Sequence, residues 1–333
     1  MHLRRRHFCC LPLVPAASLP TLSVQAQNVT TSTAEDQIWR DEARQRDVPV
    51  RLRWPAQGAP AGQAGLPVLL FSHGLGCTRA GGSVWGEAWA QAGFLVVHLQ
   101  HPGSDLDAVR VAGSVVTDPS SLRRLGSAEQ LLARLKDVSF ALDELGRREA
   151  RAEGQWASVQ AKQVGLSGHS FGAHTTLGMA GQRYPGFEGM DEPRLAAFMA
   201  FSPSMPATSD AARAFERITR PTLCLTGTRD SDVAGTGATP RQRMAVFAAL
   251  PTGAKSQLLL KDADHMTFAG QAGVAIEVIP RAAVTRELQA SHHAAIAAIS
   301  ADWWRAHLLN DLAARARFAR PSMLAAGDVW QTG

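Results

Sequence analysis

The chain has 333 residues, of which 45% are hydrophobic and 19% are charged, as expected for a globular protein rather than a disordered one. Its formal charge of +5 includes Arg4, Arg5 and Arg6 near the N-terminus, so the rest of the chain carries only +2. No run of basic residues interleaved with aromatic residues follows. We therefore expect no nucleic-acid partner.

The first 26 residues have the features of an export signal. A basic start precedes a moderately apolar stretch, and Val24 and Ala26 are small residues on the N-terminal side of a possible cut before Gln27. Arg5 to Phe8 also match the twin-arginine form R-R-x-F of bacterial signals. We therefore predict a signal peptide over 1–26 and a periplasmic or secreted protein, or a cytoplasmic one if this segment is not a signal. No other segment is a long uninterrupted apolar run, so we expect no integral membrane segment.

The next segments predict a series of strands. Residues 27–47 are polar and predict a loose lead-in, whereas VPVRLRW at 48–54 alternates apolar and charged side chains, as a half-buried edge strand does. Six later runs are mostly apolar, which is typical of strands buried on both faces of a parallel sheet. These runs are PVLLFS at 67–72, FLVVHL at 94–99, QVGLSG at 163–168, AAFMAF at 196–201, TLCLTG at 222–227 and SQLLLK at 256–261.

Helical patterns alternate with these strands. Residues 128–150 carry apolar side chains at three- and four-residue steps behind Ser127, which we predict as the N-cap, and 292–312 predict a second amphipathic helix. Parallel neighbouring strands need crossover helices. The alternation therefore predicts an α/β fold with one doubly wound, mostly parallel sheet over 48–310.

Three segments show no helix or strand pattern. Gly181–Arg194 and Ser231–Pro240 are rich in glycine, proline and charge and predict surface loops. Residues 311–333 are basic and form a C-terminal tail without a clear pattern. We expect no large cap domain.

Ser170 is the candidate nucleophile. Gly168-His169-Ser170-Phe171-Gly172 has the form G-x-S-x-G and lies between a predicted strand and a helical run, which is the context of a nucleophile elbow. The glycines have a steric reason there, because the serine backbone is strained and neighbouring chains come too close for a Cβ. The alternative is an ordinary turn between two glycines.

The loop after the strand at 67–72 is the candidate oxyanion loop. Its sequence is His73-Gly74-Leu75-Gly76, and it would lie at the carboxyl end of its strand, where ligands bind in such sheets. The backbone N–H of Leu75, with that of Phe171, would then hold a developing oxyanion. A plain glycine-rich turn is the alternative.

An acid and a base follow two later strands. Asp230 follows TLCLTG and could orient the base, with Asp232 as its rival because a loop can aim either residue. His265 follows SQLLLK and suits a general base that takes the serine proton. The alternatives are a solvated turn acid and a structural histidine.

Other histidines and cysteines do not form a metal-binding pattern. Two cysteines, Cys77 and Cys224, remain outside the signal, neither at CxxC spacing, and a disulfide between them stays open. Four histidines near strand ends lack metal-ligand spacing and are interpreted as packing or supporting groups. They are His98, His101, His169 and His174. We predict no metal and no cofactor.

With these residues, the chain resembles serine hydrolases of the α/β-hydrolase superfamily, in particular the bacterial predicted dienelactone-hydrolase-like proteins related to platelet-activating-factor acetylhydrolases. The resemblance rests on LPVLLFSHGLG, GLSGHSFGAHTT, LTGTRDSD and DADHMTF and spans about 48–309. It implies an α/β-hydrolase fold and the chain order nucleophile, acid, base. The roles it implies are nucleophile for Ser170, acid for Asp230, base for His265 and oxyanion donors for Leu75 and Phe171.

Two features depart from those relatives. Dienelactone hydrolases use a cysteine nucleophile, whereas this chain has Ser170, so hydrolysis of an enol lactone is not implied. In the acetylhydrolases the acid follows the strand just after the elbow, but the matching stretch FMAFSPSMP contains no acid. This departure favours Asp230 and argues against a phospholipid substrate.

These features together predict a carboxylic-ester hydrolase that works through an acyl-enzyme. No long cap segment is evident between Gly172 and Asp230, so we expect an open cleft that takes small, lipid-like or polymeric esters. The alternatives are an acyltransferase, a peptidase, or a non-catalytic binding protein on the same fold. The sequence makes no prediction of the oligomeric state.

Overall fold

We describe the chain from a computed structural model at residues 32–60, 62–63, 65–112, 124–205, 210–233, 237–271 and 279–333. The predicted signal peptide, 1–26, lies outside these described residues. No helix in the described part of the chain is long and apolar enough to cross a membrane.

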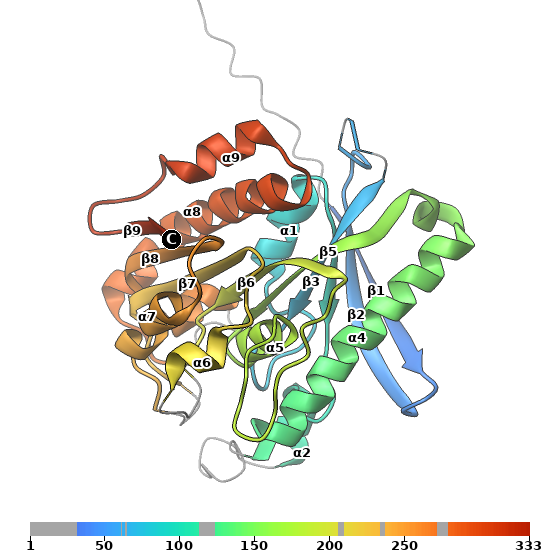
Figure 1. Cartoon of the computed structure of the whole chain (residues 1–333), viewed down its shortest axis with the longest axis horizontal. Helices are drawn as coiled ribbons and strands as arrows, with labels where there is room; N and C mark the ends of the chain where they lie inside the picture. The colour runs from blue at the N-terminus through green and yellow to red at the C-terminus, as the bar shows by residue number, and fades with distance from the viewer. Residues whose placement is uncertain are drawn as a thin grey trace, which may run out of the picture. The chain divides into compact units, whose positions relative to one another are not determined.

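The described residues form a single nine-stranded sheet in the order β1-β2-β4-β3-β5-β6-β7-β8-β9 (Figure 1). Strands β4, β3, β5, β6, β7 and β8 are parallel to one another. Strands β1, β2 and β9 pair antiparallel with their neighbours at the two ends of the sheet. The bounds are β1 Thr33–Asp41, β2 Arg46–Trp54, β3 Leu66–Ser72, β4 Leu95–Leu99, β5 Val159–His169, β6 Leu195–Phe201, β7 Thr222–Arg229, β8 Lys255–Asp264 and β9 Val329–Thr332.

Helices cover both faces of the sheet (Figure 1). The side chains of Leu69 and Phe71 in β3 belong to the core beneath α1 and α8, and those of Val68 and Leu70 belong to the core beneath α4 and α5. Consecutive apolar residues are therefore needed in β3, which confirms the predicted doubly wound, mostly parallel sheet. The bounds are α1 Ser83–Gln91, α2 Leu106–Val111, α4 Ala128–Arg151, η1 Gly154–Ser158, α5 Phe171–Met179, α6 Ala211–Phe215, α7 Pro240–Ala249, η2 His265–Ala269, α8 Ala283–Leu308 and α9 Leu312–Ala319.

The sheet extends beyond the predicted boundaries at both ends. Within the predicted lead-in, residues 33–41 form β1, so β2 is not the edge strand although its side chains alternate as predicted. Arg51 of β2 donates to both carboxylate oxygens of Asp36 in β1, at 2.7 and 2.9 Å. In the predicted tail, α9 is capped by Asp311 and β9 pairs with β8. Most side chains of β1 are exposed, and β9 depends on pairing with the distant β8, so local periodicity reveals neither edge strand.

The strand order places one topological switch point between β3 and β5. From β3 the chain passes to β4 on one side, and then crosses through α4 to β5 on the other side. Ligands bind at such points, outside the carboxyl ends of the strands. Ser72, the last residue of β3, pairs with Gly168 of β5, so the loops that follow the two strands start side by side.

Candidate active site

Ser170 lies on a strained turn between β5 and α5. Its backbone has φ 56° and ψ −113°, outside the regions that non-glycine residues favour. The Ser170 N–H donates to the carbonyl of Phe201 at 3.0 Å, and its carbonyl accepts from Ala173 at 2.8 Å. The neighbouring strand and helix thus hold a conformation that costs on the order of 1–3 kcal/mol.

The two flanking glycines are required by close backbone contacts. A Cβ on Gly168 would lie 2.3 Å from the carbonyl oxygen of Gly172. A Cβ on Gly172 would lie 1.9 Å from the carbonyl oxygen of Ser72. The turn therefore packs directly against the end of β3, and a side chain at either glycine would displace it.

Asp230 and His265 form a buried hydrogen-bonded pair. Asp230 follows β7 and His265 begins η2 after β8, and Nδ1 of the imidazole lies 2.8 Å from Oδ1 of the carboxylate. Thr226 donates to Oδ2 at 2.8 Å, and Arg243 Nε lies 3.0 Å from Oδ1. With Nδ1 bound to Asp230, Nε2 is the nitrogen available to take a proton. Asp232, the rival acid, instead accepts from the backbone N–H of Gly237 at 2.9 Å.

His265 lies beside the nucleophile turn. The ring centroids of His265 and His169 are 4.6 Å apart, and Nε2 of His169 lies 3.0 Å from the carbonyl oxygen of His265. Burial and the neighbouring His265 lower the pKa of His169 well below its usual value, so His169 is neutral. The structure therefore places His265 against His169, the residue that precedes Ser170.

The predicted oxyanion loop also adjoins the turn. A Cβ on Gly74 would lie 3.6 Å from Cβ of Ser170, which places the loop directly beside the serine. Among the described residues, the N–H groups of Leu75 and Phe171 donate to no protein acceptor. Two backbone donors thus remain available on the two segments that flank Ser170, as an oxyanion hole requires.

Several buried charged residues around this site were not predicted from the sequence. Arg243 of α7 contacts Asp230, and Arg134 of α4 donates to the carbonyl of His73 at 2.6 Å. Arg134 lies in the buried stripe of α4 between Leu131 and Val138. A charged residue within an apolar helical stripe is a signal that could have identified it.

Neither the comparisons with known proteins nor the described side chains point to a family or a metal site. No protein-family model matches this chain, and no curated protein matches it. Within the described ranges, no three side chains of histidine, cysteine, aspartate or glutamate gather as metal ligands. Cys77 and Cys224 are both free thiols. The geometry of the site is therefore the basis for a function.

Proposed function

We propose that this chain is a carboxylic-ester hydrolase with Ser170 as its nucleophile, His265 as its base and Asp230 as its acid. The observation that carries the proposal is the 2.8 Å hydrogen bond between Asp230 and His265, beside a serine held at φ 56°. Burial of Asp230 supports its role, because a dry carboxylate fixes the imidazole tautomer and stabilises an imidazolium.

In the first half of the proposed reaction, Ser170 Oγ attacks the ester carbonyl carbon. Its proton passes to Nε2 of His265, and the carbonyl oxygen becomes an oxyanion that accepts from the N–H groups of Leu75 and Phe171. The carbon–oxygen bond to the alcohol then breaks, and the alcohol leaves with the proton from His265. An acyl-enzyme on Ser170 remains.

In the second half, water attacks the acyl carbon and gives one proton to His265. The tetrahedral intermediate breaks its bond to Ser170 Oγ, which takes that proton back, and the carboxylic acid leaves. Every proton transferred in this cycle passes through His265, and the same two backbone donors serve both halves.

Hydrolysis of p-nitrophenyl esters from acetate to palmitate tests the proposal. We expect turnover by the wild type and a loss on the order of 10⁶-fold in kcat for Ser170→Ala. Ser291→Ala, an exposed serine that bonds only within α8, should keep wild-type rates. A fluorophosphonate should label the wild type and Ser291→Ala but not Ser170→Ala. A folded wild type that neither hydrolyses any ester nor takes the label would overturn the proposal.

A further inference from the structure

A second serine–histidine–aspartate set lies behind the oxyanion loop. Ser72 Oγ is 2.9 Å from His101 Nε2, and His101 Nδ1 is 3.0 Å from Asp137 Oδ2. All three side chains are fully buried, so no substrate can reach Ser72. These residues can hold structure in place but cannot perform nucleophilic chemistry.

Two arginines of the β1–β2 hairpin complete the contacts of Asp137. Arg44 donates to Oδ1 at 2.8 Å, and Arg46 donates to both oxygens at 2.8 and 3.0 Å. Burial opposes ionisation, but the hydrogen bonds from His101 and Arg46 lower the pKa of Asp137 to about 2. Asp137 is therefore a fixed negative charge inside α4.

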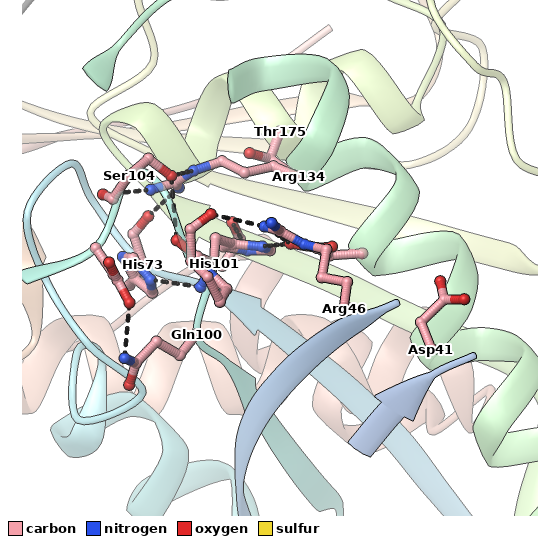
Figure 2. Close-up of polar contacts among 12 residues, drawn as sticks. Asp41, Arg46, His73, Gln100, His101, Ser104, Arg134 and Thr175 are labelled. Atoms are coloured by element: carbon pink, nitrogen blue, oxygen red, sulfur yellow. Dashed lines mark hydrogen bonds and ion pairs between the residues drawn. The ribbon is translucent and has the colours of Figure 1, made fainter. Parts of the chain in front are cut away.

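Arg134, one turn before Asp137 on α4, reaches both halves of the oxyanion hole. Figure 2 shows its side chain extending toward Ser104, close to His73 and His101. Its guanidinium donates to the carbonyl of His73 at 2.6 Å and lies 4.3 Å from the ring centroid of Phe171. Burial lowers the pKa of Arg134 to about 9, so the group stays charged at neutral pH.

Ser104 provides a second connection between Arg134 and the oxyanion loop, besides the direct one to the His73 carbonyl. Its hydroxyl accepts from Arg134 Nε at 2.8 Å, and its carbonyl accepts from Gly76 N–H at 2.9 Å. The loop is therefore fixed on both sides of Leu75, at the carbonyl of His73 and at the N–H of Gly76.

His73 fixes the peptide that carries the Leu75 N–H. The backbone N–H of His101 donates to His73 Nε2 at 3.0 Å, so the proton of this neutral ring lies on Nδ1. Nδ1 then donates to the Gly74 carbonyl at 2.6 Å, and Cys77 N–H donates to the same oxygen at 3.2 Å. That carbonyl and the Leu75 N–H belong to one planar peptide and point in opposite directions. Two hydrogen bonds on the oxygen therefore orient the N–H.

We propose that Arg134 is a positioning residue that holds both oxyanion donors, Leu75 and Phe171, in place. The Ser72–His101–Asp137 set anchors the backbone N–H that orients His73. The inference rests on the proposed hydrolase function, and it adds residues that touch neither the substrate nor the reacting atoms.

Variants of Arg134 in the full-length chain test this inference. Arg134→Met removes every donor, Arg134→Lys keeps the charge but not the forked geometry, and Arg147→Met is the control. Arg147 lies on the same helix, is 45% exposed, and pairs with Glu144. Titration with a fluorophosphonate counts the competent sites, so kcat is expressed per titrated site. Inhibition by a trifluoromethyl ketone reports the oxyanion hole separately, because Ser170 Oγ adds to its carbonyl, His265 takes the proton and the carbonyl oxygen becomes an oxyanion.

We expect Arg134→Met to lower kcat per titrated site by roughly 30- to 100-fold with KM changed less than threefold, since loss of a whole donor costs about 10²–10³. Affinity for the ketone should fall by the same factor, Arg134→Lys should be intermediate, and Arg147→Met should match the wild type.

Three results would overturn the inference. These are wild-type kcat per titrated site in Arg134→Met, a loss confined to KM, or a kcat loss without loss of ketone affinity. If Arg134→Met does not fold, Arg134→Lys decides by the same criteria. A wild type without Ser170-dependent activity would instead remove the proposed function, and this inference with it.

Discussion

The guanidinium of Arg243 lies 3.0 Å from the carboxylate of Asp230, and both side chains are buried. Arg243 also donates to the main-chain carbonyls of Asp230 at 2.8 Å and Ser202 at 2.6 Å. One arginine therefore neutralises the carboxylate and fixes the loop that carries it.

Arg243→Met should lower the free energy of unfolding by about 3–5 kcal/mol, because it leaves a buried carboxylate without its cation. Urea denaturation measures the change. Arg229→Met is the matched control, since its exposed side chain pairs with Asp262 at the surface and should contribute less than about 1 kcal/mol. Equal losses in the two variants would contradict this account of Asp230.

Asp230→Asn should lower kcat on the preferred ester by about 10⁴-fold, because an amide no longer fixes the tautomer of His265 or stabilises its cation. Asp232→Asn changes a carboxylate that accepts from the Gly237 N–H, and it should stay within about threefold of the wild type. Steady-state kinetics on both variants separates the two acids. A larger loss in Asp232→Asn would reassign the acid.

Gly172→Ala should damage both stability and activity, because its Cβ would meet the Ser72 carbonyl at 1.9 Å. Overpacking costs about 1–3 kcal/mol, and a 1 Å displacement of the turn would cost about 10²-fold in rate. Gly146→Ala, at an exposed position of α4 with nothing within 4 Å, should instead stabilise the chain by about 0.5–1 kcal/mol. Thermal unfolding and ester kinetics distinguish the two; a fully active Gly172→Ala would refute the steric argument.

Buried histidines should make the fold sensitive to acid above the range in which its carboxylates titrate. Burial lowers the pKa of His98 to about 3 and those of His101 and His174 to about 4. An unfolded histidine titrates near 6.5, so between pH 6.5 and 4 the unfolded chain binds more protons and stability falls as the pH falls. As the pH falls, each histidine lowers the free energy of unfolding by about 1.4 kcal/mol per pH unit. The three together lower it by about 4 kcal/mol per pH unit near pH 5.

Thermal unfolding from pH 8 to 4.5 checks this expectation. Asp137, with a pKa of about 2, stays ionised throughout that range, so its titration does not account for the expected loss. A melting temperature that is constant between pH 7 and 5 would contradict the predicted loss.

The sequence predicted the parallel strands because burial on both faces leaves a local trace. All seven residues of β3 are buried, and their consecutive apolar side chains are readable without any partner. The β1 strand left no such trace, because most of its side chains are exposed and polar, so no run of apolar residues marks it.

The candidate site was predicted in part for a similar reason. Ser170, Asp230 and His265 each follow a strand that local patterns reveal, and the order of the sheet brings the last two together. The preference for Asp230 over Asp232 as the partner of His265 depends on Thr226 and the distant Arg243. Spacing along a loop cannot supply that information.

Because Ser72 pairs with Gly168, the strand spacing of the sheet sets the distance between the two segments of the candidate site. The oxyanion loop and the nucleophile turn begin on adjacent strands, whose separation of about 4.8 Å is a constant of backbone hydrogen bonding. The segment Gly181–Arg194 joins the end of α5 to the start of β6, at the opposite edge of the sheet, and has no part in setting that distance. We therefore expect that its length and side chains can be changed without altering the spacing between the proposed nucleophile and oxyanion donors.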